Sequence, residues 1–403
     1  MNIEAHITLR KSTTKENDII NKWRKEAGDH TRPLESGSDS PVKEKSGLYS
    51  VLYKNELIGG FGVLYRKFTK IGEDNFKPFK TPTQGYFLYG AVSNPKYRGK
   101  GYFKHRYKVL GDMFPDGYYG NMKDERAEKT KKVFQKCNYT FTQVGDAGIY
   151  KAYKWEFKKH KISALWVGDN PLNTIAWMSI NSFVQRLKYP YTLYTYNPEL
   201  EVPEGVTLKD ASKILPKSTI WTTKEGYNKG GVSGAFSDEF RFKLLLTKGG
   251  IWVDADVICL KYFYLGSGYL FTSQQHFDNP TWAASCFIKI PRRRNRGRDV
   301  LRRCIREIGK LDKDKIYHGQ IGPDLLEGVT AHMGITKAPY YFVNSVDWED
   351  CPGKLIEPGV ELDPRATLLH LNNSRFTFTG VDPDQDYPNS IFQKYKDLYG
   401  PGI

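Results

Sequence analysis

The sequence lacks long hydrophobic runs and contains few cysteines. No window approaches the roughly 18 consecutive apolar residues of a membrane-spanning helix, and residues 1–10 lack the apolar core of a signal peptide. The 5 cysteines are odd in number, scattered, and never form a CxxC pair, which argues against a disulfide framework or a zinc site. We therefore expect free thiols and a location in the cytoplasm.

The length and the distribution of charge predict two different domains. A chain of 403 residues exceeds what one ordinary hydrophobic core accommodates. The formal net charge is +16, and residues 1–160 contain 31 Lys and Arg against 18 Asp and Glu, whereas residues 161–403 contain 30 against 27. This asymmetry indicates that the first domain binds a polyanion, either a nucleic acid or an acidic membrane or glycan surface. A basic face that only meets solvent would have the same composition.

Two carboxylates interrupt an apolar, strand-forming run at residues 248–258. Because residues two apart in a strand point to the same side, Asp254 and Asp256 would be directed at one place. A buried pair of like charges is costly, and a divalent cation removes that cost. Mg²⁺ and Mn²⁺ prefer such oxygen ligands, and Gly249 and Gly250 allow another backbone to approach closely. The pattern predicts a metal site that holds a nucleoside diphosphate, although many Asp-x-Asp pairs are only turn caps or solvated loops.

A helical pattern precedes the carboxylate pair. Apolar residues at helical spacing from Ala235 to Leu246 predict a helix with Asp238 and Arg241 on one face. The whole region resembles the sugar-binding DXD region of the glycosyltransferase family that includes bacterial capsular-polysaccharide transferases, yeast mannosyltransferases and the glucosylating clostridial toxins. The matching residues are Ser237, Asp238, Arg241, Gly249, Gly250, Trp252, Asp254 and Asp256.

This resemblance implies a GT-A-like (Rossmann-like) α/β domain that transfers a sugar from a nucleoside-diphosphate sugar with retention of configuration. Asp254 and Asp256 would hold Mn²⁺ or Mg²⁺, and the resemblance implies catalytic roles for Asp238, Arg241 and Asp256, with the first two holding sugar hydroxyls. His370 belongs to a segment that resembles the family's late H-L-W-N motif. It is a candidate third contact to the metal or the diphosphate, although a structural histidine would fit equally well.

The pattern at residues 162–196 predicts a βαβ unit. Apolar runs at Ile162–Val167 and Tyr191–Tyr196 predict two strands, and Asn170 is the expected N-cap of the helix between them. Because ligands of such sheets bind at the carboxyl ends of the strands, Trp166 and Asp169 would contact the donor nucleotide. Trp166 could instead pack in the core.

Three further segments have open interpretations. Arg292–Arg298 contains five arginines in seven positions, which suits phosphate groups or an ordinary solvated loop. The glycine-rich segment Glu225–Gly234 is typical of a loop that closes over a ligand. His318–Pro323 resembles the glycosyltransferase family's glycine-proline turn beside the acceptor cleft.

The first domain begins with predicted strands at Leu48–Tyr53 and Leu57–Tyr65, joined by a short turn, followed by a third at Gly85–Val92. A glycine-rich loop with Arg98 and Gly101 comes next and leads into a helical pattern. A strand, loop and helix in this order offer backbone N–H groups to a phosphate.

This order of elements resembles the GNAT-type N-acetyltransferase fold, whose loop binds coenzyme A. Arg98 and Gly101 match the loop pattern, whereas Phe103 replaces the usual Gly or Ala and would crowd a phosphate. We therefore predict a GNAT-like, mixed α/β basic domain at residues 1–159, which binds either the acceptor or acetyl-CoA. A GT-A-like domain follows at residues 160–403, and the charged segment Lys151–Lys161 marks the boundary.

The combination leaves three interpretations of the function. The first is a metal-dependent retaining glycosyltransferase that modifies a hydroxylated (hydroxymethyl) base in phage DNA, bound through the basic first domain. Such an enzyme would work in the host cytoplasm. The second is a bifunctional acetyltransferase and glycosyltransferase of surface polysaccharide biosynthesis. In the third, the first domain is only a binding module.

Overall fold

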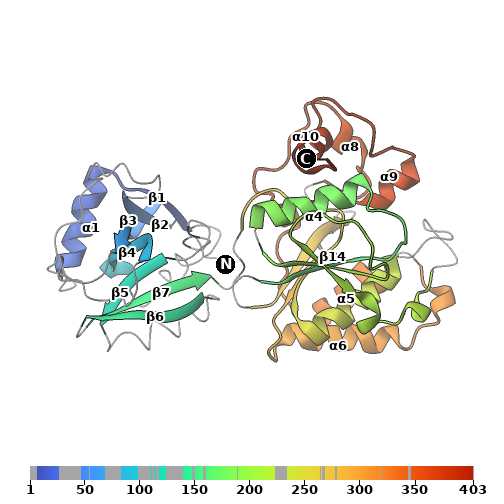
Figure 1. The fold of residues 1–403 in the computed structure, drawn as a ribbon, viewed down its shortest axis with the longest axis horizontal. Helices are drawn as coiled ribbons and strands as arrows, with labels where there is room; N and C mark the ends of the chain where they lie inside the picture. Colours follow the sequence, from blue (N-terminus) through green and yellow to red (C-terminus); the bar gives the residue numbers. More distant parts are fainter. Residues whose placement is uncertain are drawn as a thin grey trace. The chain divides into compact units, whose positions relative to one another are not determined.

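The computed structural model shows a chain of two compact units (Figure 1). The first comprises Met1–Lys158 and Tyr264–Ser267, and the second comprises Lys159–Phe263 and Gly268–Ile403. Each unit combines a sheet with helices, so the predicted two-domain α/β fold class is confirmed. The structure describes residues 7–26, 47–53, 55–68, 83–98, 110, 114, 118–123, 139–147, 150–157, 160–187, 189–222, 234–263, 265, 268–276, 279–317, 319–343 and 346–402.

The first unit is built on a 7-stranded sheet with the order β1-β2-β3-β4-β5-β7-β6. Neighbouring strands are antiparallel except for β4 and β5, which are parallel. Helix α1 (Thr14–Glu26) lies against β3 where Gly60 leaves space for Ile20. The strands are β1 (Ile7–Lys11), β2 (Gly47–Tyr53), β3 (Glu56–Phe68), β4 (Thr83–Ser93), β5 (Tyr118–Lys123), β6 (Tyr139–Ala147) and β7 (Tyr150–Phe157).

The predicted hairpin in this unit is confirmed, but the sequence analysis did not predict the last strand of the unit. Strands β2 and β3 pair across a turn in which Asn55 has a φ of 65°. The charged segment expected to mark the domain boundary is largely strand β7, which pairs with both β5 and β6. Its apolar residues alternate at Tyr153, Trp155 and Phe157, the period of a strand with one apolar face. Counting charges alone hid this period.

The second unit contains a 6-stranded sheet with the order β10-β9-β8-β11-β14-β13. The first four strands in this order are parallel, and β14 and β13 are antiparallel to their neighbours. The chain leaves β8 for β9 on one side and returns to β11 on the other. A crevice for ligands is expected at such a reversal, outside the carboxyl ends of β8 and β11. The strands are β8 (Ile162–Trp166), β9 (Tyr191–Thr195), β10 (Val206–Asp210), β11 (Gly250–Val253), β13 (Leu270–His276) and β14 (Asn279–Ile290).

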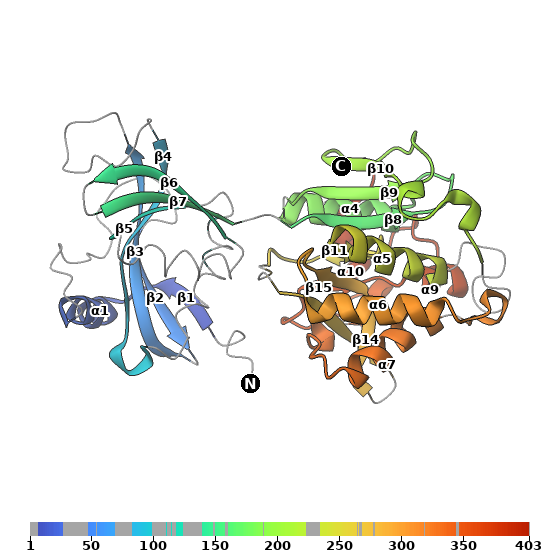
Figure 2. The same cartoon turned by 90° about the horizontal axis from the view of Figure 1, so that it is seen from below.

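Helices cover both faces of this sheet (Figures 1 and 2). Helix α4 (Thr174–Leu187) lies on one face, and α5 (Gly234–Lys248) and α6 (Arg296–Ile308) lie on the other. The large buried side chains on the α5 side include Phe240 and Trp252.

The predicted βαβ unit is present as β8-α4-β9, but its helix starts later than expected. The side chain of Asn173 caps it by accepting the Ala176 N–H at 2.8 Å. Asn170, the expected cap, instead lies in the loop after β8, where its carbonyl accepts the indole N–H of Trp166 at 2.9 Å.

The rest of the second unit contains shorter elements. Strands β12 (Val257–Cys259) and β15 (Leu368–His370) form a separate 2-stranded antiparallel sheet. The remaining helices are α7 (Leu325–His332), α8 (Gly353–Ile356), α9 (Asn373–Thr379) and α10 (Ile391–Tyr399). The four described cysteines, Cys259, Cys286, Cys304 and Cys351, are buried and free. Within the described ranges, no helix has the length and apolar character of a membrane span.

The two glycines before β11 allow close backbone contacts, as the sequence predicted. Gly249 has a φ of +66°, and a Cβ added there would lie 2.8 Å from the backbone nitrogen of Arg292. Gly250 has a φ of +107°, and an added Cβ would lie 2.8 Å from the carbonyl oxygen of Lys161. Both neighbours are backbone atoms of the sheet, so a larger residue would shift the strand that leads to the carboxylate pair.

Gly250→Ala is expected to destabilise the second unit. The strained backbone alone costs about 1–3 kcal/mol, and the collision with Lys161 adds to this. Gly328→Ala is the matched control, because a Cβ added there meets nothing within 4 Å and should stabilise α7 by about 0.5–1 kcal/mol. Thermal unfolding of both variants measures the difference. A Gly250→Ala protein as stable as the unsubstituted chain would contradict this account.

Candidate active site

The carboxylate pair lies in the turn that joins β11 to β12. Strand β11 ends at Val253, and the Val257 N–H donates to the carbonyl of Asp254 at 3.3 Å. The prediction that Asp254 and Asp256 share one side of a continuous strand is therefore wrong. Their carboxylates converge for a different reason, because the turn folds them toward His370. One ligand atom from each of these three residues lies within 4.8 Å of the others.

This turn lies at the crevice expected from the strand order. The Asp254 N–H donates to the carbonyl of Cys286 at 2.9 Å, which holds the turn against β14. Trp166 ends the neighbouring parallel strand β8 at the same edge and is partly buried. Asp169 follows in the loop, is exposed, and lies 3.5 Å from Lys217. The two residues predicted to contact a nucleotide are thus at the same sheet edge as the carboxylate pair.

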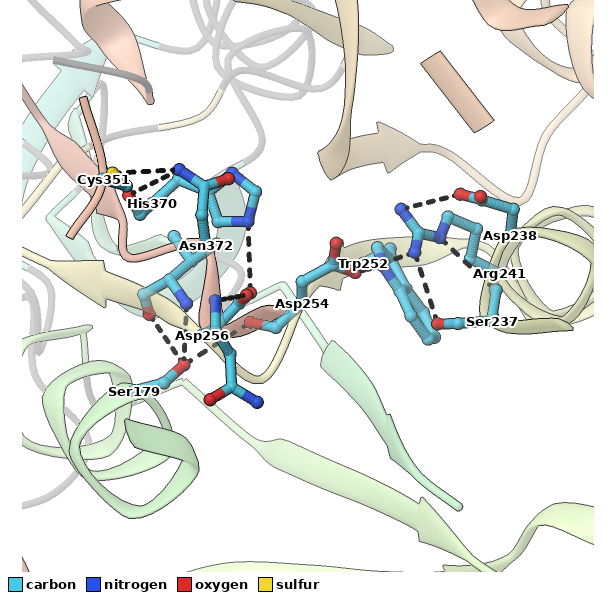
Figure 3. Close-up of polar contacts among 12 residues, drawn as sticks. Ser179, Ser237, Asp238, Arg241, Trp252, Asp254, Asp256, Cys351, His370 and Asn372 are labelled. Carbon is cyan, nitrogen blue, oxygen red and sulfur yellow. Dashed lines mark hydrogen bonds and ion pairs between the residues drawn. The ribbon is translucent and has the colours of Figure 1, made fainter. Parts of the chain in front are cut away.

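One half of the site pairs Asp256 with His370 (Figure 3). The Nε2 atom of His370 lies 3.2 Å from Oδ1 of Asp256, and the Asn373 N–H donates to Oδ2 at 2.9 Å. Burial alone lowers the pKa of His370, but Cys286 and Asp256 outweigh it and hold this pKa well above its usual value. Burial alone raises the pKa of Asp256, but His370 and the Asn373 N–H outweigh it and keep this pKa low. The pair is therefore an imidazolium and a carboxylate.

The other half of the site is organised by Arg241 of α5, which is 3% exposed. Its guanidinium lies 3.1 Å from Oδ1 of Asp238 and 3.1 Å from Oδ1 of Asp254. It also lies over the ring of Trp252, whose indole N–H donates to Asp254 at 2.6 Å. The predicted helical pairing of Asp238 with Arg241 is confirmed, and Arg241 extends it to the carboxylate pair (Figure 3).

The site carries an excess of negative charge. Burial raises the pKa of Asp238 to about 6, against the lowering effect of Arg241. Burial also raises the pKa of Asp254, with Arg241 acting in the opposite direction and Asp256 in the same one. When all three carboxylates are ionised, they face only two cationic groups, Arg241 and protonated His370. This imbalance makes the site attractive to a further cation.

Two serines of α4 fix the turn, and sequence reasoning missed them. The hydroxyl of Ser179 donates to the carbonyl of Val257 at 2.7 Å and lies 3.2 Å from its N–H. The hydroxyl of Ser182 accepts the Cys259 N–H at 2.8 Å. Both serines are 0% exposed. The available signal was the occurrence of small hydroxyl residues within an otherwise apolar helix pattern.

Gly322 was also missed as a site residue, although it belongs to the predicted glycine-proline turn. It lies in a π-helical turn, Gln320–Asp324, directly against the carboxylate of Asp238. A Cβ added to Gly322 would overlap that carboxylate. His318 lies outside the described residues.

The other predicted phosphate contacts are distributed over the two units. Arg292 follows Ile290, which pairs with Gly250 at the amino end of β11, opposite the edge that carries Asp254. The arginine run, which the sequence leaves open between phosphate contact and a solvated loop, therefore begins away from the carboxylate turn. In the first unit, Arg98 is exposed and its Nε donates to the carbonyl of Ser93 at 3.2 Å. Gly101 lies outside the described residues.

The residues present fit a divalent cation. Oδ1 of Asp256 is buried yet accepts no well-directed hydrogen bond, which leaves a lone pair for a metal. Carboxylate oxygens and an imidazole nitrogen are common ligands of Mn²⁺. With a neutral His370, the three carboxylates would be balanced by Arg241 and the two charges of the cation.

No protein-family model and no curated protein matches the sequence. Among solved structures, the chain is similar to the PaToxG glycosyltransferase at 15% identity and a TM-score of 0.30, covering 68% of this chain and 96% of that one. It is similar to a GNAT-family acetyltransferase from Streptococcus agalactiae at 12% identity and a TM-score of 0.25, covering 38% and 96%. A spermidine N-acetyltransferase SpeG variant from Vibrio cholerae aligns at 12% identity and a TM-score of 0.25, covering 37% and 92%.

Both kinds of protein named from the sequence are thus represented among similar structures, at low identity and partial coverage. TM-scores of this size define neither the fold nor the activity of this chain. Both are therefore argued from its own residues.

Ser179→Ala is expected to loosen the carboxylate turn. Losing a buried hydroxyl that serves a backbone carbonyl costs about 1–3 kcal/mol, and loss of such a supporting contact typically weakens metal binding by about 10–100-fold. Titration with Mn²⁺, followed through the electron paramagnetic resonance of the free ion, measures the affinity. Ser212→Ala, at an exposed position of the same unit, should bind Mn²⁺ normally. Unchanged affinity in Ser179→Ala would show that α4 does not support the site.

Proposed function

We propose that the second unit is a metal-dependent retaining glycosyltransferase that uses a nucleoside-diphosphate sugar. The observation that supports this most is the convergence of Asp254, Asp256 and His370 at the strand-order reversal between β8 and β11. An α/β sheet binds ligands at this place.

The proposed division of roles follows the two halves of the site. Asp254, Asp256 and His370 would hold the cation, and Trp166 and Asp169 would contact the nucleotide. When bound, the cation would supply Lewis-acid stabilisation of the departing diphosphate.

Asp238 and Arg241 would bind the hydroxyls of the sugar. Asp238 is held by Arg241 on one side and by Gly322 on the other, so its carboxylate has a fixed direction. A fixed direction is useful because contacts that strengthen in the transition state require groups that do not reorganise. Arg241 also holds Asp254, so it would align the sugar with the metal site.

Asp256→Asn is expected to abolish most turnover of the donor. The amide keeps the size of the carboxylate and can still accept the Asn373 N–H, so the fold should persist, but the charge that holds the cation is lost. Removal of such an electrostatic contact reduces the rate by about 100-fold or more. Release of nucleoside diphosphate from a panel of nucleotide sugars measures turnover. Asp299→Asn, at a partly exposed position paired with Arg302 on the surface, serves as the control.

A result of equal turnover in Asp256→Asn, the control and the unsubstituted protein would remove the metal-dependent mechanism. A loss in both variants would point to a general effect on folding instead, which circular dichroism resolves.

For the acceptor, we propose DNA that carries a hydroxylated base. The motivation is the charge of the first 160 residues, 31 basic against 18 acidic, which suits a phosphate backbone. Access to a base inside a duplex would require it to leave the stack. The base hydroxyl would then be the nucleophile that receives the sugar.

Mass spectrometry of nucleosides tests this acceptor. DNA containing 5-hydroxymethylated bases is incubated with the protein, Mn²⁺ and a nucleotide sugar, and is then digested. A nucleoside heavier by one anhydro-sugar is expected, and it should be absent with unmodified DNA. Donor hydrolysis without any sugar-bearing nucleoside would reject DNA as the acceptor while leaving the donor chemistry intact.

A further inference from the structure

The second unit carries a concentrated positive charge that the proposed active site does not use. Residues 292–310 contain 9 Lys and Arg and 2 acidic residues, a net charge of +7. Residues 161–403 as a whole have a net charge of +3, so the remainder of this region has a net charge of −4. A local concentration of positive charge attracts anionic partners over longer distances than a single ion pair does.

Helix α6 presents four of these nine basic side chains to solvent. Its apolar residues face the core, where Val300, Leu301, Cys304 and Ile308 are buried. Its opposite face is exposed, and we call Arg296, Arg302, Arg303 and Arg306 the arginine stripe. The side chains of Arg302 and Arg306 are 50% and 64% exposed, respectively.

Much of the positive charge of the arginine stripe is not neutralised by ion pairs within the protein. Arg302 lies 2.5 Å from Asp299, and Arg306 lies 3.4 Å from Glu307, but such exposed pairs are worth little. No acidic side chain in the described part of the chain pairs with Arg296 or Arg303. A partner with regularly spaced negative charge could therefore engage several arginines at once.

The arginine stripe runs from one edge of the sheet toward the edge that carries the carboxylate turn. Helix α6 follows the arginines 292–294, which lie at the edge of the sheet opposite the carboxylate turn. At its other end the chain continues to Lys313, which lies 3.0 Å from Glu239, the neighbour of Asp238 in α5. With 13 residues, α6 is about 20 Å long. The stripe thus runs along the unit toward the edge that carries the site.

We propose that the arginine stripe binds the phosphate backbone of a nucleic-acid duplex and leads it toward the carboxylate site. This deepens the proposed DNA acceptor and rests on it. A duplex carries about one phosphate per 1.7 Å of its axis, so a helix about 20 Å long faces several phosphates. Arginine rather than lysine makes up the stripe, and its planar guanidinium binds phosphate oxygens in a bidentate manner.

The same features disfavour an anionic membrane as the partner. A helix that lies in a membrane surface inserts an apolar face, whereas the apolar face of α6 packs in the core. The exposed large apolar residues in the described ranges are Leu311, Tyr317, Phe378 and Leu398, and none of them lies within α6.

The test compares two triple variants of the full chain. One replaces Arg302, Arg303 and Arg306 by Gln, and the control replaces Lys209, Lys213 and Lys394, exposed lysines elsewhere in the same unit, by Gln. Fluorescence anisotropy with a short labelled DNA duplex, across a series of salt concentrations, gives the affinity and its salt dependence. Loss of three phosphate contacts should reduce the slope of log K against log salt by about 2–3. We expect affinity at least about tenfold weaker for the arginine variant than for the control.

Each other outcome contradicts the proposal in a recognisable way. Equal affinity and slope in the two variants would show that the duplex does not use the stripe. No binding by the unsubstituted protein at low salt would remove both the stripe and the DNA acceptor. Stripe-dependent binding to phosphatidylserine vesicles without duplex binding would assign the surface to a membrane. Release of nucleoside diphosphate in the absence of DNA should be equal in both variants, so failure of the stripe is distinct from failure of donor turnover.

Discussion

The site depends on how three carboxylates are held near one another, Asp238 in α5 and Asp254 and Asp256 in the turn after β11. Asp238, Asp254 and Asp256 repel one another, and the chain offsets this repulsion with Arg241 and His370. The compensation is incomplete, because three negative groups meet two positive ones. A divalent cation with a neutral His370 would restore the balance. The chemistry we propose follows from this charge deficit and from its position at the crevice of the sheet.

The same ionic contacts join parts of the chain that are far apart in sequence. Arg241 links α5 to the turn after β11, and Asp256 links that turn to His370 of β15 and to the Asn373 N–H. Ser179 and Ser182 of α4 hold the end of this turn and the start of β12 through hydrogen bonds to the backbone of Val257 and Cys259. These contacts bring the residues of the site together in one place. Substitution of Arg241 would leave Asp238 and Asp254 without their cationic partner, and loss of one partner of a buried ion pair is strongly destabilising.

Much of this arrangement could be predicted from the sequence, and the failures have physical causes. Local sequence patterns predicted α5 and the β8-α4-β9 unit, because the helix has apolar residues at helical spacing and the two buried strands are short apolar runs. Contacts between distant segments could not be predicted in the same way, because no local pattern around Ser179 or Gly322 identifies the residue that each of them contacts. The apolar run continues through Asp254 and Asp256 and therefore predicts a strand there. In the structure the chain turns at these residues, and Val257 begins β12, which pairs with β15. Helix α4 is capped by Asn173 and not by Asn170, whose carbonyl accepts the Trp166 indole N–H in the preceding loop.

The most direct test of the central claim is a crystal structure with Mn²⁺ and an unhydrolysed nucleotide sugar, recorded with anomalous scattering. The account predicts an anomalous peak bound by Asp254, Asp256 and His370, with the diphosphate next to it and the base near Trp166. A nucleotide bound elsewhere, with Asp254 still paired to Arg241, Asp256 still paired to His370 and no anomalous peak between them, would contradict it.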